Sequence, residues 1–336
     1  MALFRKREEE IDLKPENRRV RKEPSKPWGK KERIFVLLTL LLTVIISFLL
    51  DLSSRDYKLP GFPRLKLVMP SLDIFKGETI IVGNKQEDKT IAKEKIVKEF
   101  EDKTKELSGV YALYVADPNS NFSFGIDENE IMQAASLIKL PAIVGLYKEA
   151  EAGKISLDTK YSLKSTDKVG GSGSLYAKPT GTIYTYRELV NLMGKQSDNT
   201  AFNVIRKILG DEKINAVAKE IGMTSTSLND NSTTAKDMGT FFIKLYQGEI
   251  VSEIHKNEIL DSLTNTIYES WMIAGIPEDV RVAHKYGREI HVVNDAGIIF
   301  ADKPFILVLL TRGVVEKEAD EVFPELTGIV YRRMIE

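Results

Sequence analysis

The chain has 336 residues, of which 43% are hydrophobic, so it can form one large domain or two smaller ones with a sizeable core. Its formal net charge of −1 gives no indication of a nucleic-acid partner. The absence of cysteine excludes disulfides, thiolate nucleophiles and cysteine metal sites. The three histidines, His255, His284 and His291, lack the spacing of a metal site, and we expect no metal and no other cofactor.

The N-terminal part is predicted to attach the chain to a membrane. Residues 1–33 carry twelve Lys or Arg against seven Asp or Glu. They precede an uncharged run, residues 34–50, in which fourteen of seventeen residues are apolar, and which is long enough to cross a bilayer. The positive-inside rule then predicts that residues 1–33 form a cytoplasmic tail, and that a single transmembrane helix over residues 34–51 puts the rest outside.

A cleaved signal peptide is the alternative interpretation of this run. The run is longer than the apolar core of a typical signal peptide, and no small-x-small cleavage site follows it closely, so an uncleaved anchor is favoured. Residues 52–90 contain three prolines and no long periodic pattern, which predicts an extracytoplasmic stalk, with a short hairpin at 79–82.

A globular domain is predicted over residues 91–336. It begins with a helix over 92–107 and two strands, 110–115 and 122–126, that are joined by a turn at Asp117-Pro118-Asn119. The middle of the domain is predicted to be helical. The expected features are a buried helix at 136–152, a polar Gly/Ser-rich loop at 154–183, a capping box at Thr185–Glu188, and helices near 200–209 and 235–247.

Three further strands, 281–286, 290–300 and 304–311, and an amphipathic helix close the chain. The two ends of the domain are therefore expected to share one antiparallel five-stranded sheet, flanked by helices, with an all-helical subdomain beside it. The predicted fold therefore contains both helices and strands (α/β in the broad sense), and it is α+β in the narrower classification.

Three short motifs carry the chemistry, in the order Ser136-Leu-Ile-Lys139, Ser197-Asp198-Asn199 and Lys285-Tyr286-Gly287. Two of these patterns are common by chance, and both recur in residues 165–170. The surrounding sequence distinguishes the two copies of the first motif. Ser136 opens a buried apolar helix, whereas the second copy lies in a polar, glycine-rich stretch.

The motifs, with the surrounding segments AASLIKLPAIVGLYKEAEAGKISLD, QSDNTAFNVI and NDAGIIF, resemble those of class A β-lactamases and penicillin-binding proteins. The resemblance covers roughly residues 91–336. It implies a β-lactamase/transpeptidase-like fold and a serine hydrolase that works through a covalent acyl-enzyme.

The residue types fit that chemistry. Ser136 and Lys139 lie on one face of a helix, one turn apart. A serine hydroxyl needs a base, and Lys139 is one only when neutral. Burial and a second cation, Lys285, are expected to lower the pKa of Lys139. The backbone N–H groups of Ser136 and Arg288 are expected to form an oxyanion hole.

Other roles are implied by the resemblance alone. Ser197 would relay a proton between Lys139 and the leaving nitrogen, and Asn199 would hold the amide side chain of the substrate. Lys285 would supply charge near Ser197 and the substrate carboxylate, with Tyr286, Gly287 and Arg288 completing the substrate-binding side.

The sequence departs from the family at two places. Class A β-lactamases use a loop glutamate to activate the deacylating water, but residues 221–236 contain no Glu, and Asp230 is the only carboxylate there. Acylation is therefore expected, with slow deacylation. Tyr286 replaces a Thr or Ser that helps to bind the substrate carboxylate, and Arg288 is expected to take over that contact.

Three functional hypotheses follow. The first is a β-lactamase-like hydrolase of β-lactams or related acyl donors. The second is a cell-wall D,D-peptidase or transpeptidase-like enzyme that acts on peptidoglycan peptides. The third is a catalytically inactive domain that binds wall fragments. The presence of all the motif residues together argues against it, because an inactive domain does not need them.

Overall fold

The computed structural model describes residues 29–54 and 85–335, in two compact units, 1–78 and 79–336. In the first unit a helix forms, α1 (Lys30–Ser54), and it includes the predicted anchor at 34–51. The apolar side chains from Ile34 to Ile46 are exposed.

Within the part of the chain that the structure describes, no helix combines the length and hydropathy needed to cross a membrane. The transmembrane segment over 34–51 is therefore not confirmed. Residues 1–28, most of the predicted tail, lie outside the described residues. So do residues 55–84, which hold most of the predicted stalk and its hairpin.

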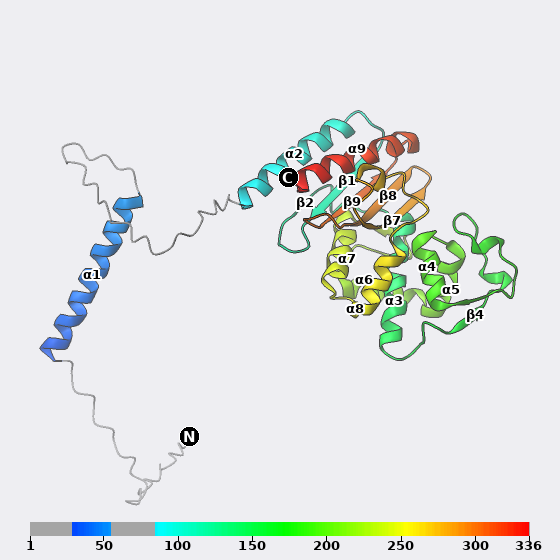
Figure 1. The fold of residues 1–336 in the computed structure, drawn as a ribbon, viewed down its shortest axis with the longest axis horizontal. Helices are drawn as coiled ribbons and strands as arrows, with labels where there is room; N and C mark the ends of the chain where they lie inside the picture. Colours follow the sequence, from blue (N-terminus) through cyan, green and yellow to red (C-terminus); the bar gives the residue numbers. More distant parts are fainter. Residues whose placement is uncertain (1–28, 55–84, 336) are drawn as a thin grey trace, which may run out of the picture. The chain divides into compact units, whose positions relative to one another are not determined.

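The second unit is built on one five-stranded antiparallel sheet, with the strand order β2-β1-β9-β8-β7 (Figure 1). Its strands are β1 (Val110–Ala116), β2 (Ser123–Ile126), β7 (Val282–Glu289), β8 (Val292–Ile299) and β9 (Phe305–Arg312). The expectation that the two ends of the domain share one sheet is confirmed. Because β7 is an edge strand, the side of its backbone away from β8 can face a substrate beyond His284, whose N–H donates to the Leu263 carbonyl.

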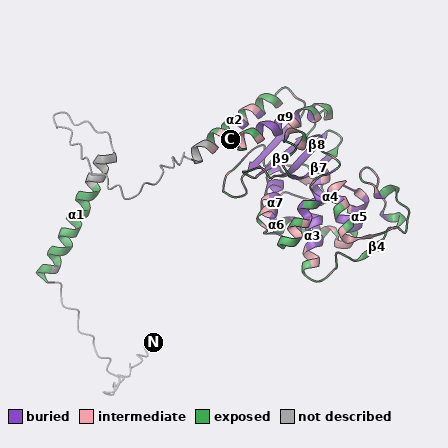
Figure 2. Cartoon of the chain, viewed as in Figure 1, coloured by how far each residue is buried: buried purple, intermediate pink, exposed green. Residues whose placement is uncertain are grey.

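Helices cover both faces of the sheet. One face packs against α2 (Lys85–Thr104) and α9 (Glu316–Ile335) through a cluster that includes Phe100 and Phe323. The other face packs against α7 (Ala235–Gln247). The strands are almost entirely buried (Figure 2).

The helical part lies between β2 and β7 in the sequence (Figure 1). Its helices are α3 (Lys139–Glu151), α4 (Tyr186–Lys195), α5 (Asn199–Leu209), α6 (Asp211–Ile221) and α8 (Glu253–Ser262), alongside α7. The sequence analysis did not predict α6 or α8. The capping box of α4 is formed, since the Thr185 N–H donates to the Glu188 carboxylate at 2.6 Å and the Glu188 N–H to the Thr185 hydroxyl at 3.2 Å.

Two small sheets complete the second unit. The predicted loop over 154–183 contains β4 (Lys160–Ser162), which pairs with β5 (Ile183–Thr185). Nearer to Ser136, β3 (Met132–Gln133) pairs with β6 (Ser232–Thr233). This second pairing ties the segment before α3 to the segment before α7.

Candidate active site

Ser136 lies on a short 3-10 turn, η2 (Ala135–Ile138), that leads directly into α3. Ala135, just before it, has a φ of +49°, which is unusual for a residue with a side chain. The Asn294 amide on β8 donates to the Gln133 carbonyl at 2.8 Å and holds the chain that enters the turn. Backbone kept in such a conformation by its surroundings is typical of active sites.

Lys139 is almost fully buried one turn after Ser136. Its ammonium contacts three side chains, with Nζ 2.7 Å from Ser136 Oγ, 3.2 Å from Ser197 Oγ and 2.8 Å from Asn199 Oδ1. Burial lowers the pKa of Lys139 to about 8, although two nearby carboxylates oppose the shift. The structure therefore brings together the first two motifs around one nitrogen.

The second motif is held rigidly at the start of α5. Ser197 has a φ of +53°, and the Asp198 side chain caps the helix by accepting from the Ala201 N–H at 2.8 Å. The same carboxylate accepts from the Leu175 N–H at 2.8 Å, so it also fixes the loop that faces the site. Asp198 is thus a positioning residue, to which the sequence analysis gave no role.

Asn199 uses both ends of its amide. Its Oδ1 accepts from Lys139, and its Nδ2 donates to the Gly170 carbonyl at 2.9 Å. A substrate amide that bound Asn199 as predicted would have to share its Oδ1 with Lys139 and its Nδ2 with the Gly170 carbonyl. Asn199 therefore links the lysine to the loop that borders the site.

Lys285 of the third motif is fully buried, and its Nζ donates to the Tyr286 carbonyl at 3.0 Å. Burial, and secondarily the charge of Lys139, lower the pKa of Lys285 well below its ordinary value. Because the repulsion between two cations is mutual, each lysine disfavours the protonated form of the other.

Gly287 lies against the turn that carries Ser136. A Cβ on Gly287 would be 2.9 Å from the Ser136 amide nitrogen and 3.0 Å from the Ala135 Cβ, so a side chain there would displace the turn. The His284 N–H points away from β8, because it donates to the Leu263 carbonyl at 2.8 Å. Backbone direction repeats every two residues along a strand, so the Arg288 N–H points to that same side, as an oxyanion hole requires.

The Arg288 side chain packs against α9 and Trp271, and does not point to the side of the site where its backbone N–H is used. Its guanidinium donates to the Asp320 carboxylate on α9 at 2.7 Å and lies over the Trp271 ring, with its central carbon 5.6 Å from the ring centroid. This position does not favour the predicted contact with a substrate carboxylate. The contribution to the site that the geometry supports is the backbone N–H.

Comparison with known proteins decides the family. A model of the Beta-lactamase enzyme family matches residues 92–334, which is most of the chain. The chain belongs to that family. It is a serine hydrolase with the β-lactamase/transpeptidase-like fold, as the motifs predicted.

Relatives and solved structures agree with this assignment. Beta-lactamase VEB-1 of Pseudomonas aeruginosa is 21% identical over 285 residues, which cover 77% of this chain and 92% of that protein. The structure of PBP-A is 25% identical, with a TM-score of 0.67, over 72% of this chain and 95% of PBP-A. An ancestral class A β-lactamase has a TM-score of 0.67 at 23% identity, over 70% of this chain and 99% of that one.

Residues 221–236, which include the segment between α6 and α7, contain no glutamate. The segment between α6 and α7 approaches the Ser136 turn, since the Asn231 carbonyl accepts from the Ala134 N–H at 2.8 Å. Asp230 is exposed, and its carboxylate accepts from the Ser227 hydroxyl at 2.8 Å. The segment therefore passes beside the site without a free carboxylate of its own to act as a base.

The second copy of the first motif does not form a similar site. Lys168 Nζ donates to the Lys178 carbonyl at 2.5 Å, and among the described residues no bond joins it to the Ser165 hydroxyl. His284, next to the third motif, forms a buried contact with Asp295, with Nδ1 2.8 Å from the carboxylate. His284 therefore joins β7 to β8 and takes no part in the site.

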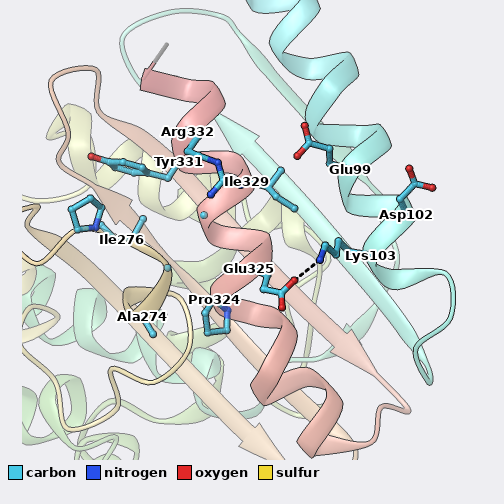
Figure 3. Close-up of a pocket in the computed structure, with 13 residues that line it drawn as sticks. Glu99, Asp102, Lys103, Ala274, Ile276, Pro324, Glu325, Ile329, Tyr331 and Arg332 are labelled. Atoms are coloured by element: carbon cyan, nitrogen blue, oxygen red, sulfur yellow. Dashed lines mark hydrogen bonds and ion pairs between the residues drawn. The ribbon is translucent and has the colours of Figure 1, made fainter.

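A separate groove of about 680 Å³ lies between α2, α9 and the segment 274–277 (Figure 3). The Lys103–Glu325 ion pair spans part of it at 2.6 Å. No residue of the three motifs lines this groove, so it is distinct from the acyl-transfer site. In residues 29–54 and 85–335 no group of three or more His, Asp or Glu side chains is arranged to hold a metal ion.

Proposed function

We propose that the enzyme transfers the acyl group of an amide or ester donor to Ser136, and that β-lactams are one class of such donors. The observation that carries this proposal is the buried Lys139 nitrogen, which lies within 3.2 Å of both the Ser136 and the Ser197 hydroxyls. A base, a nucleophile and a relay hydroxyl at one point are what acyl transfer needs.

The reaction would proceed in two stages, the attack of Ser136 and the departure of the leaving group. Neutral Lys139 accepts the Ser136 proton while Oγ forms a bond to the carbonyl carbon, and the negative charge that develops on the carbonyl oxygen is met by the N–H groups of Ser136 and Arg288. The bond from carbon to the leaving nitrogen or oxygen then breaks. Ser197 gives its proton to the leaving atom and receives the proton held by Lys139.

Slow deacylation is the second part of the proposal. Hydrolysis of the acyl-enzyme needs a base for the incoming water. The only carboxylate in residues 221–236 is that of Asp230, which is exposed and already accepts from Ser227. A solved structure of a PBP-A variant is an acyl-enzyme complex with penicillin G, at 25% identity and a TM-score of 0.66 over 72% of this chain and 96% of that one. This supports β-lactam acylation here.

A cell-wall D,D-peptidase or transpeptidase remains the second candidate function. The lack of a loop glutamate favours it, because such an enzyme passes its acyl group to an amine of the wall and does not need rapid hydrolysis. Adding a D-amino acid acceptor to the acylated chain distinguishes the two. Release of an acyl–amino acid product supports the transferase, and release of the free acid alone supports the hydrolase.

The test of the proposed function is an intact-mass time course of the full chain with penicillin G, run beside Ser136→Ala. We expect an adduct of the mass of the whole β-lactam that persists on the unsubstituted chain and is absent from the variant. Rapid loss of the adduct with turnover would contradict slow deacylation. No adduct at high penicillin concentration would overturn the proposal and favour a catalytically inactive binding domain.

We also propose that the catalytic unit lies outside the cytoplasmic membrane, held there by residues 34–51. The support is the uncharged run of these residues with its basic flank in residues 1–33. Protease added to intact, wall-stripped bacterial cells that express the full chain should cleave the catalytic unit. Protection from protease, or recovery of the chain in the soluble fraction, would contradict this location.

A further inference from the structure

The middle residue of the third motif, Tyr286, has a position that the family's small hydroxyl residue could not take. Its side chain is only 3% exposed, although β7 is an edge strand. Its ring packs on the Tyr268 ring, with centroids 3.9 Å apart, and on the Trp271 ring at 5.7 Å. The ring is therefore fixed by its neighbours.

This ring covers the ammonium group of Lys285. The Lys285 Nζ lies 4.1 Å from the Tyr286 ring centroid, and its one hydrogen bond among the described residues goes to the Tyr286 carbonyl. The negative face of an aromatic ring attracts a cation in this geometry. Lys285 is 0% exposed. Its ammonium group already contacts the ring and carbonyl of Tyr286, so it is screened from a substrate carboxylate.

The Tyr286 hydroxyl is buried, and within the described residues it has no hydrogen-bond partner. Burial, and secondarily the interaction with Tyr268, raise the pKa of the phenol well above its ordinary value, so it stays protonated. The ring is therefore held as a neutral phenol in its stack with Tyr268 and Trp271.

We propose that Tyr286 is a specificity-determining residue, whose ring closes the anion site of Lys285 and so disfavours acyl donors that present a carboxylate there. This assignment rests on the proposed function. A carboxylate would meet the Tyr286 ring instead of the Lys285 ammonium group, and would lose hydration without gaining a cation. A neutral ester group at the same place carries a smaller desolvation cost.

The other nearby cation does not restore an anion site. The Arg288 guanidinium is paired with Asp320 at 2.7 Å and lies over Trp271. The Arg288 guanidinium therefore has its charge balanced within the protein, and the Lys285 ammonium group is covered by the Tyr286 ring.

The experiment compares penicillin G with its methyl ester, which has the same acyl group but no carboxylate. The second-order rate constant for acylation of the full chain is measured for each by intact mass. We expect the ester to react roughly tenfold faster than the acid. Tyr286→Thr opens the anion site, and should shift the ratio of the two rate constants toward the acid by roughly tenfold or more.

Tyr286→Phe separates the covering ring from the hydroxyl. It keeps the ring, so the acid should stay slow and the ratio of the two rate constants should match that of the unsubstituted chain. Tyr111→Phe is the matched control, because the Tyr111 hydroxyl is also buried on the sheet and has no hydrogen-bond partner in the part of the chain that the structure describes. Acylation by Tyr111→Phe should equal that of the unsubstituted chain.

The outcomes distinguish this assignment from the proposed function. A preference of the unsubstituted chain for the acid, or a ratio that Tyr286→Thr leaves unchanged, would overturn the role of Tyr286 alone, since acylation would still occur. No adduct from either compound would overturn the proposed function and, with it, this assignment.

Discussion

The ammonium nitrogen of Lys139 lies 2.7 Å from the hydroxyl oxygen of Ser136, one helical turn away. Lys139 is 2% exposed, and burial lowers its pKa to about 8. An ordinary lysine has a pKa near 10.4, so this shift makes the neutral form on the order of a hundredfold more abundant at neutral pH. The pair therefore contains a nucleophile and a base in one side-chain contact.

The first prediction concerns pH. The neutral form of Lys139 is the base, so the acylation rate should rise with pH and level off above a pH of about 8. Stopped-time mass spectrometry of the adduct across pH 5 to 10 measures this profile. Lys139→Arg stays protonated over that range and should lose at least 100-fold in rate. A flat profile, or near-normal acylation by Lys139→Arg, would show that another group is the base.

The second prediction concerns Gly287. An added Cβ would lie 2.9 Å from the Ser136 amide nitrogen, so Gly287→Ala should displace an oxyanion donor and reduce acylation by roughly 100-fold or more. Gly170→Ala is the control, because a Cβ there would make only ordinary contact with Tyr176 at 3.7 Å. Acylation rates and thermal unfolding are measured for both. Equal effects of the two variants on acylation would argue against an oxyanion hole at Gly287.

The third prediction concerns Asn294, which joins the turn before Ser136 to the sheet. It donates to the Gln133 carbonyl at 2.8 Å and accepts from the Thr311 N–H at 2.9 Å. Asn294→Ala leaves both groups unpaired, so the free energy of unfolding should fall by about 1–3 kcal/mol. Acylation should fall roughly tenfold or more, because the nucleophile is less well placed.

Asn203→Ala is the control for that variant. Asn203 donates to the Asp167 carbonyl at 2.9 Å, a contact that does not involve the turn before Ser136. Urea unfolding should show a loss of stability in both variants, with slower acylation in Asn294→Ala alone. Slower acylation of similar size in both would mean that Asn294 acts only through general stability.

The fourth prediction concerns Asp230. Because its carboxylate is exposed and bound to Ser227 at 2.8 Å, Asp230→Asn should leave the decay of the acyl-enzyme unchanged within about twofold. The decay is followed by intact mass after excess penicillin is removed. A decay at least tenfold slower in Asp230→Asn would identify that carboxylate as the deacylation base.

Much of the fold could be predicted from local pattern. The alternating apolar runs predicted all five strands of the main sheet, and the Thr185–Glu188 capping box predicted the start of α4. Helices α6 and α8 were missed, although Gly210, with a φ of +80°, separates α5 from α6 and could have indicated a new helix. The placement of residues 34–51 in a membrane stays a prediction.

The site could be predicted only in part. Spacing along one helix predicted the contact of Ser136 with Lys139, because that contact is local. The pairing of Arg288 with Asp320 joins residues far apart in the sequence, and no local pattern could indicate it. Strand alternation could have placed the Tyr286 and Arg288 side chains on one side of β7, but not the closure of the Lys285 site by the Tyr286 ring, which depends on the three-dimensional packing.

Mapping the adduct to a residue tests the central claim most directly. The full chain is acylated with penicillin G, digested, and its peptides are sequenced by tandem mass spectrometry. The account predicts the acyl mass on Ser136 and on no other residue. Acylation of Ser165, which has its own lysine three residues later, or of Ser197 would contradict the assignment of Ser136 as the nucleophile.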